Sequence, residues 1–253
     1  MQAKWTSRLT AGVFVGLFVV CLTPVGQAAS IDPNQRTGIE QIVRDYLVQH
    51  PEVLQEAFEA LQRKQAEAQA AAQKQVLSAN RDKLLYSPRQ VVLGNPQGDI
   101  TLVEFFDYNC PYCHRALSDT MDLLRTDPNL RMVLKEFPVL GPGSTEAAKV
   151  AIALKRQGTD KYLAFHQQML SGRGQVNEQR ALDVAKNVGA DMAQLKKDMA
   201  DPEVQATIAE VYGLANALGI SGTPSYVIGD EVVPGAVGSS ALKEKITAAR
   251  VRP

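Results

Sequence analysis

The sequence has few cysteines, and their positions do not suit disulfides that would stabilise a fold. Three occur in 253 residues, and two of these, Cys110 and Cys113, lie three positions apart. A bridge between them would close almost no loop, so it would add little as a structural staple. In an oxidising compartment, a lone C-x-x-C pair is better explained by redox chemistry.

The sequence also lacks a net charge and a run long enough to span a membrane. Its 27 Lys and Arg residues balance 27 Asp and Glu residues, and removal of residues 1–28 leaves 25 basic and 27 acidic side chains. A near-neutral chain has no electrostatic attraction for nucleic acid or an anionic membrane, so we expect no nucleic-acid partner. The apolar run at residues 9–22 is too short for a comfortable membrane span.

That apolar run is instead typical of a secretory signal peptide. It follows the basic residues Lys4 and Arg8 and precedes small residues that suit a cut after Ala28. We therefore predict that residues 1–28 are a signal peptide cleaved near Ala28, and that the protein acts in the periplasm. The third cysteine, Cys21, is removed with this segment.

Residues 30–85 are predicted to form a helical head and stalk. Apolar residues recur at helical spacing in 37–61, and a capping box, with Thr37 as N-cap and Glu40 after it, marks the first helix. Residues 62–75 contain nothing apolar larger than alanine, so they favour helix but have little to bury. Two interpretations stay open: a solvated helical linker, or a semi-rigid stalk behind a head that packs against copies of itself.

The stretch from Thr101 to Arg115 places the cysteine pair at the start of a helix. β-forming residues lead into Cys110-Pro-Tyr-Cys113, and apolar residues at helical spacing follow. The first turn of a helix has free backbone N–H groups and a partial positive charge, which stabilise a thiolate. We therefore predict that Cys110 is the nucleophile and that Cys113, one turn further along, can reach its sulfur. Pro111 suits the first helical position because it has no N–H to leave unpaired.

The rest of the chain predicts an α/β fold. A strand, a helix and a strand follow one another closely around the cysteines, which indicates a parallel βαβ unit. A run of helices then occupies residues 144–218, and the chain returns to a hairpin and a closing helix. The predicted strands lie at 90–93, 102–106, 131–138, 225–228 and 231–233, and the closing helix lies at 240–250.

This order resembles the thioredoxin fold of the DsbA-like thiol-disulfide oxidoreductases. The matching features are Cys110-Pro-Tyr-Cys113 at the first helix and Thr223-Pro224 at the opening of the fourth strand. The resemblance implies that residues 86–253 form a DsbA-like domain, and that residues 144–218 are the helical insertion of that branch. It implies no cofactor and no metal.

The N-terminal part resembles a narrower group. Residues 38–61, followed by an Ala- and Gln-rich helix, are similar to the N-terminal domain of ScsC-type proteins (suppressor of copper sensitivity) and their Com1-type relatives. In some of these proteins that segment makes oligomers and confers disulfide isomerase activity. The resemblance therefore implies a homo-oligomer formed through residues 37–61.

The family also implies roles for residues around the cysteines. Thr223-Pro224 resembles a cis-proline loop that lies against the active-site disulfide and docks the substrate backbone, although an ordinary trans turn is the alternative. Pro111 and Tyr112, between the cysteines, are expected to tune the pKa of Cys110 and the redox potential.

Glu104 and Lys135 match an acid and a lysine that, in the family, lie beneath the cysteines and pass protons to the resolving thiol, here Cys113. A buried carboxylate has a raised pKa, which suits a proton acceptor near neutral pH. The alternative is an ion pair at the strand ends with no catalytic part.

Two other kinds of chemistry stay open for the cysteine pair. With His114 after it, the pair matches the c-type haem attachment pattern C-x-x-C-H. Against haem stand the β-forming run before Cys110 and the Thr-Pro loop, so we interpret His114 as an exposed first-turn residue. The two thiols could also bind copper(I). His50 and His166 are interpreted as helix-surface residues.

We therefore expect a periplasmic protein thiol-disulfide oxidoreductase, an isomerase or reductase acting on exported proteins through Cys110 and Cys113. If the head oligomerises, several sites face a shared space, which favours the shuffling of wrong disulfides. A membrane thiol reductase of the DsbD or ScsB type would then keep the pair reduced. The alternatives are a monomeric DsbA-like oxidase and, outside the enzymes, a copper-binding or holdase protein.

Overall fold

The computed structural model describes residues 32–251 of the chain. The predicted signal peptide, residues 1–28, lies outside these residues. The chain forms two compact units, Met1–Gln62 and Arg63–Pro253. Among the described helices, none combines the length and the apolar character that a membrane crossing requires.

The start of the first helix differs from the capping-box prediction. The helices concerned are α1 (Pro33–Gln49) and α2 (Pro51–Ala79), which begins in the first unit. The N–H of Arg36 donates to the carbonyl of Asp32 at 2.9 Å, and the hydroxyl of Thr37 donates to the carbonyl of Pro33 at 3.1 Å. Thr37 therefore lies inside α1, and its predicted role as N-cap is wrong. Pro33 has a preset φ and no N–H to leave unpaired, so it can open the helix a turn earlier.

The first unit exposes its apolar side chains. α1 and the start of α2 are helical, as the apolar spacing predicts, but the side chains that make this pattern are not buried within the unit. The exposed fraction is half or more for Ile39, Ile42, Val43, Tyr46, Val48, Leu54, Phe58 and Leu61. Exposed apolar side chains gathered in one unit in this way usually mark an interaction surface.

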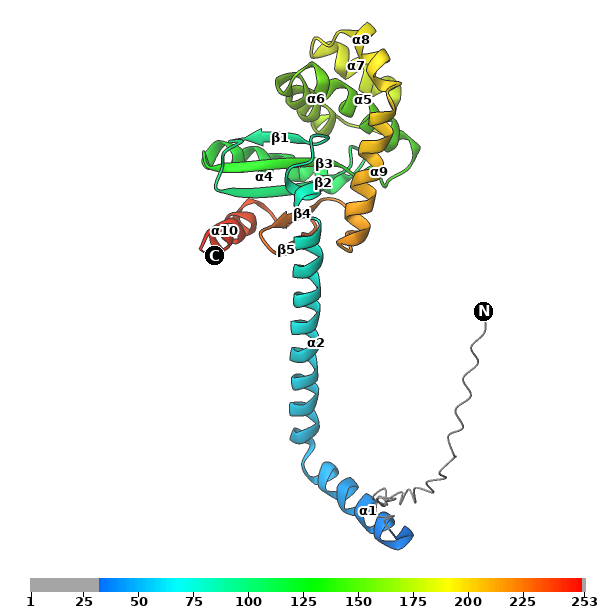
Figure 1. Cartoon of the computed structure of the whole chain (residues 1–253), viewed down its shortest axis with the longest axis vertical. Coiled ribbons are helices and arrows are strands. Elements are labelled where there is room, and N and C mark those ends of the chain that lie inside the picture. Colours follow the sequence, from blue (N-terminus) through cyan, green and yellow to red (C-terminus); the bar gives the residue numbers. More distant parts are fainter. Residues whose placement is uncertain (1–31, 252–253) are drawn as a thin grey trace, which may run out of the picture. The chain divides into compact units, whose positions relative to one another are not determined.

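The second unit contains a five-stranded sheet with a block of helices inserted into it (Figure 1). The strand order is β1-β3-β2-β4-β5, in which β2 and β3 are parallel and the other pairs are antiparallel. This confirms the predicted parallel βαβ unit and the hairpin. The strands are β1 (Val91–Gly94), β2 (Ile100–Phe106), β3 (Leu130–Glu136), β4 (Ser225–Ile228) and β5 (Glu231–Pro234).

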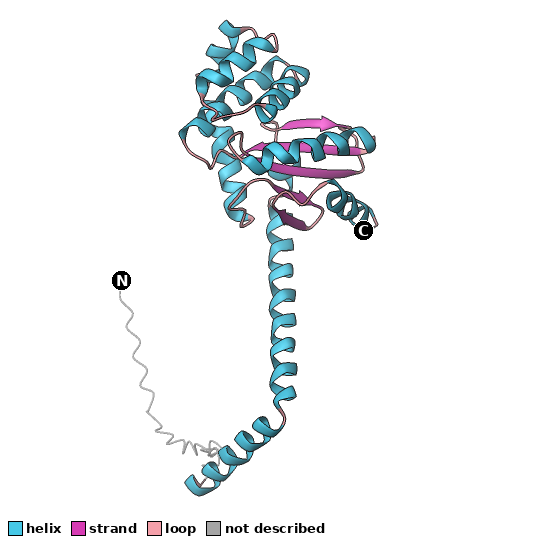
Figure 2. Cartoon of the chain, turned by 180° about the vertical axis from the view of Figure 1, so that it is seen from behind, coloured by secondary structure: helices cyan, strands magenta, loops and turns pink. Residues whose placement is uncertain are grey.

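The helices follow the predicted order, and Figure 2 shows them gathered beyond one end of the sheet and over its faces. α4 follows β2, five helices lie between β3 and β4, and α10 closes the chain. They are α3 (Arg81–Leu85), α4 (Pro111–Thr126), α5 (Pro142–Leu154), α6 (Thr159–Ser171), α7 (Glu178–Asn187), α8 (Met192–Met199), α9 (Pro202–Ala217) and α10 (Ser239–Arg250), with a 3₁₀ turn at Lys155–Gln157.

The two faces of the sheet carry separate cores, because side chains alternate along each strand. From β2, Leu102 and Phe106 join one core together with residues of α4, α5, α6 and α10. Val103 and Phe105 join the other core, which includes residues of α3, α9 and the end of α2. A residue's parity along β2 therefore decides whether it lies on the α4 side or on the α9 side.

Candidate active site

Cys110 stands at the N-cap of α4, as the sequence predicts. Its φ and ψ of −82° and 115° are extended, and Pro111 occupies the first turn. The N–H groups of Cys113 and His114 donate to its carbonyl at 3.0 and 3.1 Å. Both cysteines are free thiols and buried, with Cys110 3% exposed, whereas Tyr112 between them is 55% exposed.

A loop from the far end of the chain lies against Cys110. The Thr223–Pro224 peptide bond is cis, which confirms the predicted cis-proline loop. The sulfur of Cys110 lies 3.0 Å from the carbonyl oxygen of Thr223. On the other side of the loop, the N–H of Gly235 donates to the carbonyl of Pro224 at 2.8 Å.

The two thiols have opposite acid strengths. Cys110 has its pKa lowered to about 5, first by a hydrogen bond from the Cys113 thiol, and then by Thr223 and the backbone amides of Cys113 and Tyr112, which outweigh burial. Burial raises the pKa of Cys113 far above its ordinary value, and its hydrogen bond to Cys110 acts in the same direction. The helix start therefore holds a thiolate in front of a protonated thiol.

Glu104 lies on the same side of the sheet as α4. It is 2% exposed, and Oγ1 of Thr120 in α4 donates to its Oε2 at 3.2 Å. The pKa of Glu104 is raised to about 8, mainly by burial and also by the charges of Asp119 and Cys110, although the hydrogen bond from Thr120 lowers it. The charge of Glu104 in turn raises the pKa of Cys113. A raised pKa is what burial predicts for this carboxyl, and the group interacts electrostatically with both cysteines.

The structure does not bring Lys135 to the cysteines. In the parallel pair, Glu104 lies opposite Leu134, so Lys135, the next residue, points to the other face of the sheet. Its Nζ donates there to the carbonyl of Lys83 at 2.8 Å and to Oε1 of Gln90 at 2.6 Å. The predicted position of Lys135 beneath the cysteines, and its pairing with Glu104, are therefore wrong.

Lys135 instead helps to fasten α3 to the sheet. Burial lowers its pKa to about 8. Nearby, a nitrogen of the Arg131 guanidinium donates to the carbonyl of Leu85, the last residue of α3, at 2.7 Å. Two cationic side chains of β3 thus bind carbonyls at the C-terminal end of α3, where a helix favours positive charge.

The turn before Cys110 contains polar contacts that the sequence analysis did not identify. Asp107 is 2% exposed, and its carboxylate accepts from the N–H of Asn109 at 2.7 Å and from the N–H of Leu140 at 2.9 Å. The amide of Asn109 in turn contacts Ser144 and Val176 of the helical insertion. An Asp directly after a buried strand was the available signal for this bracing of the turn.

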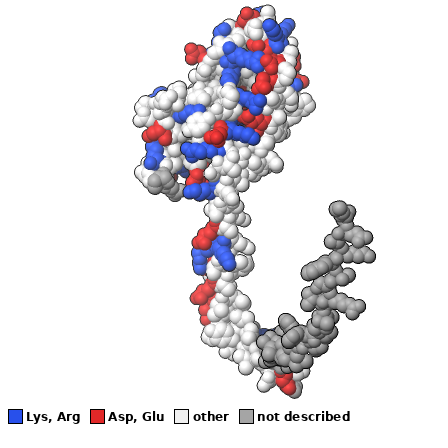
Figure 3. Space-filling model, viewed as in Figure 1, with Lys and Arg blue, Asp and Glu red and all other residues white. Residues whose placement is uncertain are grey.

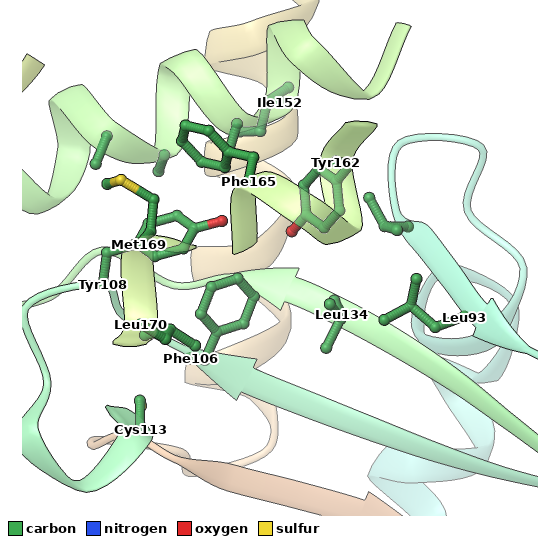
Figure 4. Packing of buried hydrophobic residues seen from close by; sticks show 14 of the residues in the cluster. Leu93, Phe106, Tyr108, Cys113, Leu134, Ile152, Tyr162, Phe165, Met169 and Leu170 are labelled. Atoms are coloured by element: carbon green, nitrogen blue, oxygen red, sulfur yellow. The ribbon is translucent and has the colours of Figure 1, made fainter. Parts of the chain in front are cut away.

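A buried polar cluster lies where the insertion meets the sheet, and Figure 4 labels two of its side chains, Tyr108 and Tyr162. The hydroxyls of Tyr108 and Tyr162 both donate to Oε1 of Glu136, at 3.1 and 2.6 Å. Burial raises the pKa of Glu136 to about 8, so it is mostly protonated at neutral pH. These groups join the end of β3, the turn after β2 and α6.

The histidines partly contradict the surface interpretation. His50 is exposed, as expected, and lies 3.0 Å from Glu52. His114 is only half-exposed, because its Nε2 bonds to the carbonyl of Tyr108 at 2.8 Å. His166 is 1% exposed, so its predicted surface position is wrong. It lies four residues after Tyr162, on the buried face of α6, and burial lowers its pKa to about 3.

Charges elsewhere on the described part of the chain are mixed. Figure 3 shows Lys and Arg interspersed with Asp and Glu over the second unit on the face in view. Within residues 32–251 there is no group of three or more His, Cys, Asp or Glu side chains placed to hold a metal ion.

The sequence matches two family models. Residues 101–247 match the model described as the DSBA-like thioredoxin domain. Residues 35–68 match the model described as the copper resistance protein ScsC N-terminal domain. The first match covers the cysteine pair and the cis-proline loop, and the second covers most of the exposed apolar helices.

Solved structures of similar proteins agree with both matches. A thioredoxin-like oxidoreductase from Silicibacter pomeroyi DSS-3 shares 48% sequence identity at a TM-score of 0.66, and the similarity covers 69% of this chain and 99% of that one. A linker-deleted form of ScsC from Proteus mirabilis shares 26% identity at a TM-score of 0.67, over 90% of this chain and all (100%) of that one.

One curated protein that matches this chain is much longer, and the similarity covers only part of it. The chain is 29% identical over 171 residues to the Na⁺/H⁺ antiporter NhaA 1 of Salinispora arenicola. The matching part is 65% of this chain but only 26% of the antiporter. The chain therefore spans about a quarter of the length of that relative.

Proposed function

The chain belongs to the family of DsbA-like thioredoxin domains, and from this premise we propose that it is a protein thiol-disulfide oxidoreductase whose reacting groups are Cys110 and Cys113. The observation that carries the proposal is the opposed acidity of the two thiols, with the pKa of Cys110 at about 5 and that of Cys113 raised. At neutral pH this arrangement supplies one nucleophile and holds the second thiol in reserve.

The proposed reaction transfers two electrons from the dithiol to a substrate disulfide. The Cys110 thiolate attacks one substrate sulfur, forms a mixed disulfide and releases the other substrate sulfur as a thiolate, which takes up a proton. Cys113 then loses its proton and attacks the sulfur of Cys110. The Cys110–Cys113 disulfide forms, the mixed disulfide breaks, and the substrate leaves fully reduced.

Glu104 is the proposed proton acceptor for the second step. It is buried, its pKa is raised to about 8, and it interacts electrostatically with Cys113. A base with a pKa slightly above the working pH can accept a proton and return it in the reverse reaction. Lys135 has no part in this proposal, because it lies on the other face of the sheet.

The cis-proline loop is the proposed docking site for substrate backbone. The Thr223 carbonyl already lies 3.0 Å from the sulfur that would bond to substrate. The exposed Tyr112 ring lies beside it and would contact the substrate after the first attack.

The first unit supports a narrower proposal, that the protein is a periplasmic disulfide isomerase that works as a homo-oligomer. The match of residues 35–68 to the ScsC N-terminal domain and the exposed apolar face of α1 and α2 both favour self-association. Several cysteine pairs in one assembly would give a substrate repeated chances to exchange wrong disulfides. Such an isomerase must stay reduced, so we propose a membrane thiol reductase as its partner.

Two assays test these proposals. Reduction of insulin should be lost in Cys110→Ser, and activity that survives this change would contradict the proposed nucleophile. Refolding of scrambled ribonuclease measures isomerase activity. Deletion of residues 32–61 should lower that activity and convert the oligomer to a monomer in light scattering, while insulin reduction persists. An unchanged mass would remove the argument for an oligomeric isomerase.

A further inference from the structure

A groove of about 730 Å³ opens beside the cis-proline loop. One wall is α4, and the rest comes from the loop that ends in Thr223-Pro224, from β5 and the turn after it, and from Gln73 of α2. The lining mixes polar and apolar residues. Among the described residues that line it, the charged ones are Arg115 and Asp119, both from α4.

Arg115 is held in a position to bind a carboxylate. Its Cζ lies 4.5 Å from the centroid of the exposed Tyr112 ring. A guanidinium that lies over an aromatic ring is oriented by it. Its own N–H donors, which lie in the guanidinium plane, stay free to bind an anion.

Neither groove charge is neutralised by a neighbour within residues 32–251, and neither takes part in an ion pair there. The next charge on the same helix behaves differently, because Asp122 pairs with both Arg125 and Lys243. The cation and the anion of α4 that form no ion pair within the described residues, Arg115 and Asp119, are therefore the two that line the groove.

The spacing of these charges fits an extended polypeptide. Tyr112, Arg115 and Asp119 are three and four residues apart, so they share one face of α4. At about 1.5 Å per residue, Arg115 lies about 7.5 Å along the helix axis from Cys110, and Asp119 lies about 6 Å further. An extended chain advances about 6.6 Å for every two residues and presents alternate side chains to the same side.

We propose that Arg115 and Asp119 select substrates by charge: an acidic side chain two residues from the reacting cysteine and a basic one four residues from it, in an extended segment. The inference rests on the proposed function, because it places the substrate cysteine at Cys110. Arg115 is exposed and Asp119 is half-buried, so solvent still screens each pair, and each contributes a modest factor, about three- to fivefold in rate.

The test uses peptides with a single cysteine, blocked as a mixed disulfide with a small neutral thiol. Stopped-flow measurement with the reduced protein compares an acidic–basic peptide, its charge-reversed form and an alanine form. We expect the acidic–basic peptide to react about tenfold faster than the charge-reversed one. Arg115→Glu should reverse the preference at the first position while Asp119 keeps that at the second, so the acidic–basic and charge-reversed peptides should then react at similar rates. Arg125→Glu makes the same charge change on α4 but outside the groove lining, so it should leave the order of peptides unchanged.

The outcomes separate this inference from the proposed function. Equal rates for all three peptides would overturn the charge selection, while rapid reaction with all of them would still support the oxidoreductase. No reaction with any peptide, together with no insulin reduction, would overturn the oxidoreductase itself. If Arg115→Glu changed all rates equally and also moved the pKa of Cys110, Arg115 would act on the thiol instead, and the selection proposal would be wrong.

Discussion

The sulfur of Cys110 lies 3.0 Å from the carbonyl oxygen of Thr223, which stands 113 positions further along the chain. They meet because β4 pairs with β2 in antiparallel fashion, so the start of β4 lies beside the end of β2, where α4 begins. The long helical insertion between them leaves this geometry untouched, because it enters after β3 and returns before β4. The contact between Cys110 and the Thr223 carbonyl is thus fixed by sheet pairing rather than by local sequence.

The hydrogen bond between the two thiols gives the first prediction. It is the largest cause of the low pKa of Cys110. Cys113→Ala removes the donor, so the pKa of Cys110 should rise from about 5 by about one to two units. Cys113→Ser keeps a hydroxyl donor at the same place and should leave the pKa much closer to its natural value. Thiolate absorbance in the ultraviolet, followed against pH, measures both. Equal pKa values in the two variants would mean that the helix start alone stabilises the thiolate.

The second prediction concerns the proton acceptor. Glu104→Gln cannot accept the proton of Cys113, so resolution of a preformed mixed disulfide should slow by about 10- to 100-fold. In the natural protein, resolution should speed up with rising pH and level off near 8, the pKa of Glu104. The variant should lack this levelling off, because Cys113 must then lose its proton to the solvent. Single-turnover release of substrate, sampled by acid quenching, measures the step.

Glu136→Gln is the matched control for that experiment. Glu136 is also buried and also has a pKa of about 8, but its carboxyl accepts from two tyrosines and is not coupled to a cysteine. Resolution in this variant should keep its rate and its pH profile. If both variants slowed equally, the effect would come from loss of packing and not from proton transfer.

Much of this site was predictable from the sequence because it depends on local patterns. Cys110-Pro111 marks the start of α4, and the β-forming residues before it mark the strand β2 that leads to the cysteines. The cis bond before Pro224 followed from a resemblance in which several separated motifs agree. Each of these features is set by residues close to one another in sequence or by a recurrent family pattern.

The failures are features that depend on which face a side chain occupies. Lys135 is misplaced by one residue of register in a parallel pair, and a one-residue difference moves a side chain to the other face. The spacing of His166, four residues after Tyr162 and one after Phe165, could have indicated that it is buried on the same face of α6. Its polar side chain led instead to the prediction of a surface position. Thr37 was predicted to be the N-cap, but the helix begins one turn earlier, at Pro33.

The third prediction tests the exposed face of the first unit. Ile42 is 69% exposed within it, and neighbouring Gln41 points to the other side of α1. If copies of the chain bury the apolar face, Ile42→Asp places a charge in that interface and should reduce the mass in light scattering toward that of one chain. Gln41→Asp adds the same charge on the polar side and should leave the mass unchanged. Identical masses for both variants would place self-association elsewhere or exclude it.

The last prediction concerns acid stability and follows from His166. Its ring lies 4.7 Å from Phe106, centroid to centroid, its Nδ1 has no hydrogen-bond partner, and burial lowers its pKa to about 3. In the unfolded chain the pKa returns to about 6.5, so between these values the unfolded state binds the extra proton. The free energy of unfolding therefore loses up to about 1.4 kcal/mol per pH unit from this group as pH falls through that window, and none above it.

His166→Phe removes this titration while keeping an aromatic ring against Phe106. We expect the midpoint of acid unfolding to move to lower pH, with little change in stability at pH 7 and above. His50→Gln removes a histidine whose side chain is exposed in the fold, so it should leave the acid midpoint where it is. Circular dichroism followed through an acid titration of the reduced protein gives the midpoint. An unchanged midpoint in His166→Phe would show that the buried ring takes up its proton at the same pH in the folded and the unfolded chain, and that burial does not lower its pKa.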